Sequence, residues 1–318
     1  MIVNAAILNE APGVAPGIPG SARTVLMGEQ KTWFITGCDK GMGYVFAETL
    51  LAHGDRVVVT ARDLATIEPL LRRHPDTAFG YQLDVTSAPD IAAVAAAAER
   101  ATGGIDVLVN NAGYGMLGPV EATAPEEYRP LFDVNFFGAA EVIRALLPAM
   151  RQRRRGYIIN TTSIGGFAAS PGFGFYAASK FALEGLSEAL AQDVAAFGIR
   201  VTILEPGSTR TDFAGGSMAR AGQQIADYDN SAVKLTLERM AARHGAQPGD
   251  PARIARILLK FSRMVDPPLR FTTGDDGLGR MRDKLRATSA EVERFAALSL
   301  SVGFDCDTPI DIDGEAKP

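Results

Sequence analysis

The chain has 318 residues, of which 47% are hydrophobic and 22% charged, and its formal net charge at pH 7 is −5. This composition is typical of a folded globular protein with a sizeable core, and the acidic balance argues against a nucleic-acid partner. The cysteines and histidines are few and scattered, so we expect neither a zinc site nor a disulfide framework, and a cytoplasmic location is the default; they are Cys38, Cys306, His53, His74 and His244.

The two ends of the chain differ in composition from the part between them. Residues 1–28 are rich in Gly, Pro and Ala and show no helical or strand period, which predicts a flexible extension. The first residues lack the basic segment of a secretory signal, and no apolar run approaches the roughly 18 residues of a membrane helix. We expect one catalytic domain over 29–304, with a helical tail after Gly274, and a polar, frayed end over 305–318.

From residue 31 onward, short β-branched runs alternate with longer helical patterns. Strands are predicted at 32–36, 56–60, 78–83, 106–110, 156–162, 199–206 and 268–273. Helices are predicted at roughly 42–53, 64–74, 88–102, 126–152, 175–197 and 250–264. This alternation predicts an α/β fold of the Rossmann-like, doubly wound type, with a seven-stranded, mostly parallel sheet and helices on both faces.

A glycine-rich turn joins the first predicted strand to the first predicted helix. Such a turn lets the backbone approach a pyrophosphate at a helix amino terminus, whereas the bland alternative is a tight turn without a ligand. The strand-to-helix context favours a dinucleotide site. The residues expected to form it are Thr36, Gly37, Asp39, Lys40, Gly41, Met42 and Gly43.

The end of the second predicted strand bears on the choice of cofactor. An NAD-binding fold places an acid there for the ribose hydroxyls, but this chain has Ala61 followed by Arg62. Arg62 and Lys40 would suit a 2′-phosphate, which favours NADP(H) over NAD(H). Asp63 is expected to cap the following helix, although it could instead serve the ribose, as could Asp39.

Two further motifs follow later strands. Asn110-Asn111-Ala112-Gly113 ends the strand at 106–110, and Tyr176-Ala177-Ala178-Ser179-Lys180 opens the helix at 175–197. Together with the glycine turn, LDVT at 83–86, Ser163 and Pro206-Gly207 followed by Thr211, these motifs closely resemble those of the short-chain dehydrogenase/reductase family. The resemblance covers about residues 31–275, and the TGxxxGxG spacing is that of the simple reductase branch.

The resemblance implies a role for each matching residue. Asp84 and Val85 would contact the adenine, and Asn111, Ala112 and Gly113 would line the cofactor ribose. Pro206, Gly207 and Thr211 would hold the nicotinamide end. The implied catalytic residues are Ser163, Tyr176, Lys180 and Asn135, of which Tyr176 and Lys180 also contact the cofactor.

The chemistry of the tyrosine and lysine follows from their spacing. Tyr176 and Lys180 lie on one face of a helix, side by side. Lowering a tyrosine pKa from about 10 to about 7 requires roughly 4 kcal/mol of stabilisation of the anion, for which a fixed lysine and an oxidised nicotinamide are suitable sources. Tyr176 could then give a proton to a carbonyl oxygen or remove one from an alcohol.

Two of the candidate catalytic residues also have simpler interpretations. Ser163 would hydrogen-bond the substrate oxygen, but it could be only a turn residue. Asn135 stands in an otherwise apolar helix, where a buried amide must find partners, so it could be a satisfied structural residue. The family resemblance instead makes it a member of the catalytic set that kinks the helix and holds a water that relays protons to Lys180.

These residues predict an NADP(H)-dependent oxidoreductase that interconverts a ketone or aldehyde and an alcohol. The alternatives are a non-catalytic dinucleotide-sensing regulator and a scaffold subunit; an intact tyrosine-lysine pair argues against the regulator. We expect a small-molecule substrate, weakly indicated to be bulky and apolar, and a homodimer or homotetramer paired through the helices at 126–152 and 175–197. The candidate pocket residues are Tyr114, Met116, Gly165, Phe167, Phe173, Phe175 and the segment 208–231.

Overall fold

The computed structural model describes residues 30–243 and 245–304. The extension predicted at 1–28, the frayed end predicted at 305–318, His244 and Cys306 lie outside these residues. Within the described ranges, none of the helices combines the length and the apolar character that a bilayer crossing requires.

Seven strands form one central sheet in the order β3-β2-β1-β4-β6-β7-β9, and every neighbouring pair is parallel. The strands are β1 (Thr32–Ile35), β2 (Arg56–Ala61), β3 (Ala78–Gln82), β4 (Val107–Asn110), β6 (Gly156–Thr161), β7 (Ile199–Pro206) and β9 (Arg270–Thr273). The predicted α/β fold is confirmed, with a sheet that is wholly parallel. The chain reverses its direction of winding between β1 and β4, and such a point opens a crevice at the carboxyl ends of the strands.

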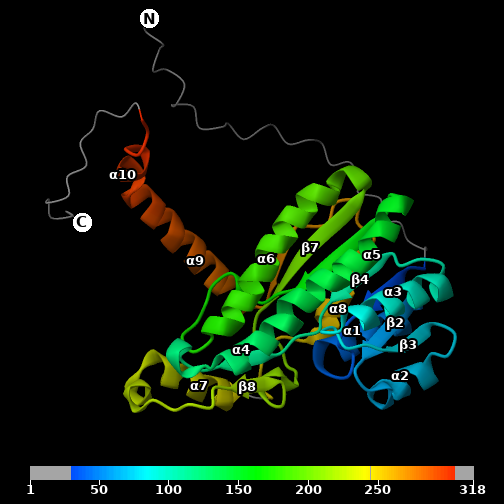
Figure 1. Ribbon diagram of the computed structural model, residues 1–318, viewed down its shortest axis with the longest axis horizontal. Coiled ribbons are helices and arrows are strands. Elements are labelled where there is room, and N and C mark those ends of the chain that lie inside the picture. The colour runs from blue at the N-terminus through cyan, green and yellow to red at the C-terminus, as the bar shows by residue number, and fades with distance from the viewer. Residues whose placement is uncertain (1–29, 244, 305–318) are drawn as a thin grey trace, which may run out of the picture.

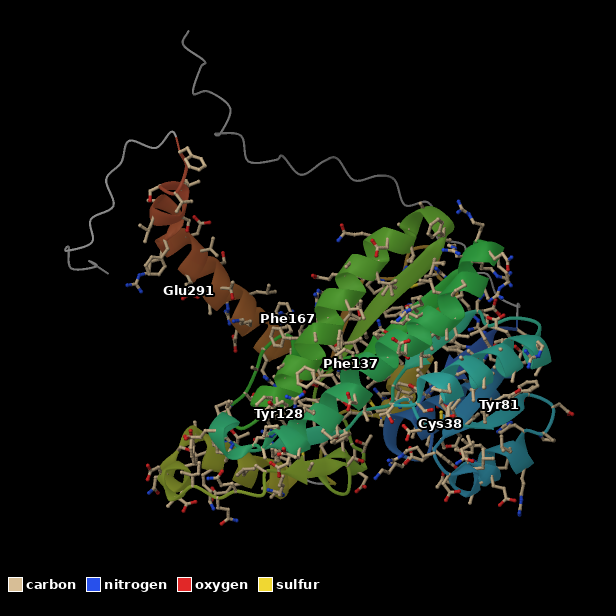
Figure 2. The ribbon with its side chains drawn as sticks, in the orientation of Figure 1. Cys38, Tyr81, Tyr128, Phe137, Phe167 and Glu291 are labelled. Carbon is tan, nitrogen blue, oxygen red and sulfur yellow. The ribbon has the colours of Figure 1, made fainter. Side chains whose placement is uncertain are left out.

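Helices cover both faces of this sheet (Figure 1). The longer ones are α1 (Gly41–Ala52), α3 (Ala88–Thr102), α5 (Ala139–Arg153), α6 (Gly174–Val194), α7 (Ala232–Arg243), α8 (Pro251–Ser262) and α9 (Asp275–Arg294), and shorter ones are α2 (Glu68–Arg73), α4 (Pro125–Phe132) and α10 (Ala296–Leu300). The last two of these in the chain, α9 and α10, extend away from the sheet, and Glu291 lies far from it (Figure 2).

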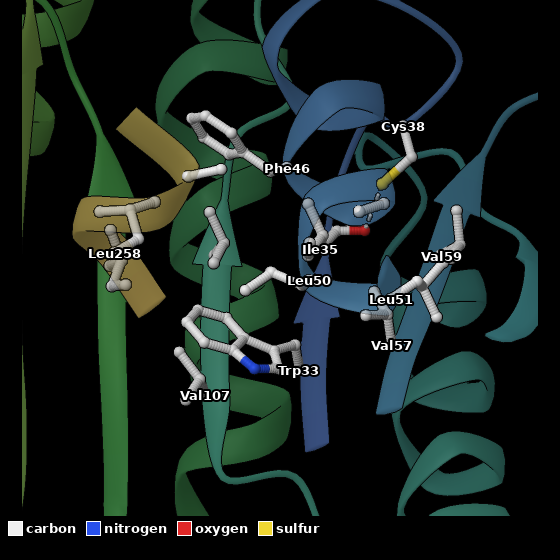
Figure 3. Packing of buried hydrophobic residues seen from close by; sticks show 14 of the residues in the cluster. Trp33, Ile35, Cys38, Phe46, Leu50, Leu51, Val57, Val59, Val107 and Leu258 are labelled. Carbon is white, nitrogen blue, oxygen red and sulfur yellow. Dashed lines mark hydrogen bonds between the residues drawn. The ribbon is translucent and has the colours of Figure 1, made fainter. Parts of the chain in front are cut away.

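Side chains of alternate residues in the central strands pack into two separate apolar layers, one on each face of the sheet. Trp33 and Ile35 of β1 pack with Phe46 of α1 and Leu258 of α8 on one face (Figure 3). Phe34, between them in sequence, belongs to the opposite layer with residues of α3, α5 and α6. Since β1, β2, β4, β6 and β7 are buried on both faces, their sequences read as largely apolar runs, whereas the edge strands β3 and β9 are only partly buried.

Two predicted helices are interrupted in the structure. The segment 64–74 begins as a 3-10 turn, η1 (Leu64–Thr66), and α2 starts anew with Pro69 in its first turn. The segment 126–152 consists of α4, a π-helical stretch, η3 (Asp133–Gly138), and α5 in succession. A prediction from periodicity alone does not contain these breaks, because the first depends on proline and a cap and the second on contacts with distant residues.

Candidate active site

A cavity of about 590 Å³ opens at the carboxyl ends of the strands, at the reversal between β1 and β4. Its walls come from the glycine turn, the ends of β2, β4 and β6, the start of α6 and the segment after β7. The predicted site residues that line it are Gly37, Asp39, Lys40, Gly41, Met42, Arg62, Asp84, Val85, Asn111, Ala112, Gly113, Tyr176, Lys180 and Thr211.

The glycine turn forms a cradle that side chains would fill. Gly37 has a φ of +69°, and a Cβ on it would lie 2.9 Å from the Cα of Ala112. A Cβ on Gly43 would lie 2.1 Å from the carbonyl oxygen of Gly37. The close approach of α1 to the turn therefore requires glycine at both positions, and it exposes the backbone and the amino terminus of α1 to the cavity, an arrangement that suits the pyrophosphate of a dinucleotide.

Hydrogen bonds from the end of β4 hold this turn in shape. The Asn111 Nδ2 donates to the carbonyl oxygens of Thr36 and Gly37, at 3.0 Å each. The Thr36 hydroxyl oxygen accepts from the backbone N–H groups of Asn111 and Ala112 at 2.9 and 3.0 Å. The side chains of Thr36 and Asn111 thus join the two strands that flank the crevice.

The two cations expected at the 2′-phosphate lie in different surroundings. Lys40 forms an exposed ion pair with Asp212, at 3.5 Å, which links the glycine turn to the segment after β7. Arg62 lines the cavity beside buried Ala61. It contributes to lowering the pKa of Asp84, although the main cause is hydrogen bonding from Thr86.

Asp63 caps the turn that follows β2, as predicted. Its Oδ1 accepts from the backbone N–H of Ala65 at 2.9 Å. This bond directs the Asp63 carboxylate towards the first turn of η1, so the side chain has a structural role beside the cavity.

Tyr176 is buried at the start of α6, between two aromatic rings. The ring of Phe173 lies 5.8 Å away and that of Phe213 lies 5.7 Å away, centroid to centroid. Burial raises the pKa of Tyr176 to about 12, against smaller lowering effects from a hydrogen bond with Ser163 and from the charge of Arg280. With protein groups alone, the residue is a neutral phenol that can donate a proton.

Lys180 is buried one turn further along α6. Its Nζ donates to the carbonyl oxygen of Thr161 at 2.9 Å. Burial lowers the pKa of Lys180 to about 8, while the charge of Glu184 acts in the opposite direction. Lys180 therefore lines the cavity with an ammonium group that loses its proton more easily than that of an exposed lysine.

A cluster of buried acids and one arginine lies beyond Lys180. Glu184 of α6 and Glu205 of β7 are nearly inaccessible, and Arg270 of β9 forms ion pairs with both, at 2.8 Å to Glu205. Burial raises the pKa of Glu184 to about 7, and the nearby Glu205 charge adds to this effect, against lowering effects from a hydrogen bond with Thr162 and from Arg270. The edge strand β9 thus supplies the cation for two acids behind α6.

Asn135 lies in the π-helical stretch η3 and is fully buried. Its amide nitrogen donates to the Tyr114 carbonyl at 3.0 Å and to the Ser179 hydroxyl at 3.1 Å, and its oxygen accepts from the Tyr114 N–H. A Cβ on Gly113 would lie between Asn135 and Lys180, within 3.3 Å of both. The side-chain nitrogen and oxygen of Asn135 therefore both have hydrogen-bond partners. The residue also lies beside Lys180, and the helix is π-helical where it occurs.

The sequence and the structure each match proteins that are already known. Residues 31–221 match a family model described as short chain dehydrogenase. An oxidoreductase of Botryotinia fuckeliana, BOA17, is 35% identical over 272 residues, which are 85% of this chain and 98% of that protein. The chain belongs to the short-chain dehydrogenase/reductase family. It is accordingly an oxidoreductase of the class that acts on alcohol and carbonyl groups.

Two further relatives extend this comparison. A solved short-chain dehydrogenase from Streptomyces avermitilis shares 38% identity, with a TM-score of 0.81 over 86% of this chain and 98% of that one. The 17-beta-hydroxysteroid dehydrogenase type 1 of Homo sapiens is 35% identical over 280 residues, 83% of this chain and 81% of that protein.

Not every predicted site residue of this short-chain dehydrogenase lines the cavity. Those outside its wall are Thr36, Gly43, Asn135, Ser163, Pro206 and Gly207. Ser163 still reaches Tyr176 by a hydrogen bond, and its hydroxyl accepts from the Gly165 N–H at 3.0 Å. The N–H of Gly207 donates to Thr273 of β9 at 3.0 Å, so this part of the motif joins the site to the sheet edge.

Only some of the apolar residues predicted to line the substrate pocket lie near the site. Tyr114 lines the cavity, and Met116 and Phe173 pack against Tyr176. Phe175 stacks on Tyr128 with centroids 4.1 Å apart. Phe167 does not line the cavity, because its ring lies under the guanidinium of Arg270, at 5.5 Å. The aromatic residues at the cavity wall are therefore Tyr114, Tyr176 and Phe213, while Phe173 and Met116 pack behind Tyr176.

Part of the predicted pocket segment 208–231 does line the cavity, including Met218 and Ala219. Sequence reasoning missed two other features of the site, a pair of short strands and an arginine of α9. The strands β5 (Gly115–Leu117) and β8 (Met218–Arg220) pair in parallel and carry Met218 and Ala219 to the cavity wall. Arg280, from α9, donates to the Ser170 hydroxyl at 2.9 Å and to the Ala168 carbonyl, and its charge reaches Tyr176. A strand of three residues is too short to show a hydrophobic period, and the sequence around Arg280 does not indicate which residues it contacts.

Proposed function

We propose that this short-chain dehydrogenase is an NADP(H)-dependent enzyme that interconverts a ketone or aldehyde and the corresponding alcohol. The observation that carries the proposal is the buried Tyr176 phenol beside Ser163 and Lys180, at the wall of a cavity that begins at the glycine turn. As part of the same proposal, residues 29–304 form one catalytic domain, which acts in the cytoplasm on a small molecule, as a homodimer or homotetramer.

The proposed reaction assigns one task to each side chain. The cofactor, when bound, supplies or accepts the hydride. Tyr176 donates its phenolic proton to the carbonyl oxygen in reduction, and the phenolate accepts a proton from the alcohol in oxidation. Ser163 hydrogen-bonds the same substrate oxygen. Lys180 binds the cofactor ribose and stabilises the phenolate, and Asn135 holds the backbone of Tyr114 and, through water, relays protons to Lys180.

Reduction suits the protein groups as they stand. A phenol with its pKa raised by burial is protonated at neutral pH, so it is ready to donate. Oxidation needs the phenolate, which requires added positive charge nearby. Lys180 and an oxidised nicotinamide are the groups we assign to supply it.

The preference for NADP(H) rests on the end of β2. Ala61 leaves no acid there, and Asp63 is engaged in capping η1. Arg62 lines the cavity and has a guanidinium suited to a phosphate. Solved structures similar to this chain hold a hydroxylated NADP in one case and NADH in another, so the preference has to come from the residues of this chain.

Replacing Ala61 by Asp and Arg62 by Ser should turn the preference towards NAD(H). The new acid serves the ribose and repels a 2′-phosphate, and the loss of one charge-assisted contact changes the preference by about tenfold to a hundredfold. The measurement is the ratio of kcat/KM with NADPH to that with NADH, for the native chain and the variant. Lys40→Gln is the matched control and should shift the ratio less, because Lys40 pairs with Asp212. A native ratio in favour of NADH would contradict the assignment.

Asp63→Ala separates the cap from a ribose acid. Loss of an N-cap bond should lower the free energy of unfolding by about 0.5–2 kcal/mol. Because Asp63 holds the Ala65 N–H, the ratio of NADPH to NADH activity should stay unchanged. Chemical denaturation and steady-state kinetics on the same variant measure both quantities. A shift of the ratio with unchanged stability would assign Asp63 to the cofactor.

The proposed substrate is bulky and apolar. Phe173, Phe213 and Met116 surround Tyr176. The names of three relatives point in the same direction, since they refer to a hydroxysteroid, retinol and 3-ketodihydrosphingosine. The decisive experiment mixes the purified protein with NADPH and ketones of graded size and follows the fall in NADPH absorbance. A chain that binds NADPH but turns over none of them would be a dinucleotide sensor.

A further inference from the structure

The loop that joins β6 to α6 surrounds Tyr176. Near its start, Ser163 hydrogen-bonds the phenol, and at its end the ring of Phe173 packs edge-on against the tyrosine ring, with centroids 5.8 Å apart. Between them, a Cβ on Gly165 would lie 3.4 Å from the Tyr176 ring. Residues 163–173 contain no ionisable side chain. A charge that acts on the phenol from this side therefore has to come from another part of the chain.

Arg280 reaches this loop from the base of α9. Its guanidinium donates to the Ala168 carbonyl and, at 2.9 Å, to the Ser170 hydroxyl. The Ser170 carbonyl in turn accepts from the Phe173 N–H at 3.1 Å. Figure 1 shows the first turns of α9 beside the loop, where the helix contacts η4 (Ile164–Gly166). Hydrogen bonds thus fix the arginine to the middle of a loop whose two ends contact the phenol.

The positive charge of Arg280 has no carboxylate partner among residues 30–243 and 245–304. Both groups that accept its hydrogen bonds are neutral, and it forms no ion pair within these ranges. Asp276, one turn earlier on α9, instead accepts from the Ser208 N–H at 2.9 Å, although its charge still acts on the arginine. Because Arg280 is partly buried, water screens its charge only in part. The charge therefore extends to the phenol of Tyr176.

Arg280 keeps its proton more firmly than Lys180, the cation next to Tyr176 on α6. Lys180 loses its charge as the pH rises through about 8, since burial lowers its pKa. Burial lowers the pKa of Arg280 as well, but a guanidinium stays charged far above neutral pH. A nearby cation favours the phenolate and so lowers the pKa of the phenol. The other ionisable side chains around Tyr176 are Tyr128 of α4, Tyr114 and Asp212 at the cavity wall, and Asp276 of α9.

We propose that Arg280 is a positioning residue for Tyr176, held by its bonds to the loop 163–173 so that its positive charge acts on the phenol. The proposal rests on the role proposed for Tyr176 as proton donor and acceptor. The charge assists alcohol oxidation, the direction that needs the phenolate, and it persists at pH values where Lys180 is neutral. The reaction thus depends on a residue of the C-terminal helix, beyond the part of the chain that carries the other assigned site residues.

Two substitutions of Arg280 separate its charge from its hydrogen bonds. Arg280→Gln removes the charge but leaves an amide that donates to the loop, so in the complex with NADP⁺ the titration of Tyr176 should move to higher pH by about 0.5–1 unit. Arg280→Lys keeps a charge and should titrate close to the native chain. The measurement is the near-ultraviolet absorbance of the phenolate against pH, taken as a difference from Tyr176→Phe. The rising limb of kcat/KM for alcohol oxidation should move in the same direction.

A second pair of variants leaves the arginine in place. Ser170→Asp brings a carboxylate to the guanidinium, which neutralises the charge, so the titration of Tyr176 should again move to higher pH. Ser170→Asn is the matched control without a charge and should leave the titration unchanged. Arg282→Gln removes an exposed positive charge from the same helix and should also have no effect. A thermal melt of each variant verifies that the domain is folded, and if Arg280→Gln does not fold, the two Ser170 variants decide.

The outcomes distinguish this proposal from the proposed reaction. Absence of the shift in Arg280→Gln or in Ser170→Asp overturns the action of Arg280 on Tyr176. An equal shift in Arg280→Lys and Arg280→Gln also overturns it, because the effect would then belong to the loop bonds and not to the charge. The absorbance measurement needs no turnover. A chain that shows the expected shifts but turns over no alcohol or ketone would contradict the proposed reaction and still support the action of Arg280.

Discussion

Tyr176→Phe should lower turnover at least about 100-fold while changing cofactor affinity little. The substitution removes the phenolic proton donor but keeps the ring, so its contacts with Phe173 and Phe213 remain. The measurement is single-turnover NADPH oxidation with a reactive ketone, combined with fluorescence titration of NADPH. Near-normal turnover would remove Tyr176 from its assigned role.

Tyr157→Phe is the matched control for that experiment. Tyr157 is also buried, and its hydroxyl donates to the Thr202 hydroxyl at 2.7 Å, within the sheet and away from the cavity wall. Loss of this bond should cost about 0.5–1.5 kcal/mol of stability and leave turnover unchanged. A comparison of the two variants separates the loss of a reacting hydroxyl from the loss of a structural one.

Lys180→Met should reduce both turnover and cofactor binding, the former by at least about 100-fold and the latter by at least about tenfold. The lysine is assigned to the ribose and to the phenolate together, and methionine has a similar length without the charge. Lys260→Met on the exposed surface of α8 is the control and should change neither quantity. A loss of only one of the two functions would contradict the double role.

The pH dependence of the native chain provides a second check on Lys180. A lysine is charged below its pKa, and burial lowers the pKa of Lys180 to about 8. The charged form is the one assigned to bind the ribose, so kcat/KM for NADPH should fall as the pH rises through about 8. A native profile that stays flat there would contradict this role of the charged lysine. The same fall in Lys180→Met would assign the titration to another group.

The parts of the fold that are encoded locally were predictable from the sequence. The inner strands β1, β2, β4, β6 and β7 appear as buried, largely apolar runs, and the cap at Asp63 follows from residues within two positions of it. The tyrosine and lysine of the site lie on one helix, where their spacing alone brings them together.

Features that join distant segments were not predictable. The π-helical stretch at Asn135 is stabilised by bonds to Tyr114 and Ser179, which no local period reveals. The Lys40–Asp212 ion pair joins residues 172 positions apart, and it engages a cation that the sequence assigned to the phosphate. In each case the partner is selected by tertiary packing, which the sequence of either segment alone does not specify.

The late position of β9 in the chain has a consequence for biosynthesis. During translation, β7 leaves the ribosome well before Arg270, and until β9 pairs with it the nascent sheet ends in an unpaired apolar edge. An unpaired strand of this kind invites aggregation. The same interval leaves Glu184 and Glu205 without the arginine that neutralises them, which opposes premature closure of α6 over the sheet. A chain cut short between these two strands would hold Tyr176 and Lys180 but lack the arginine that pairs with the acids beneath their helix.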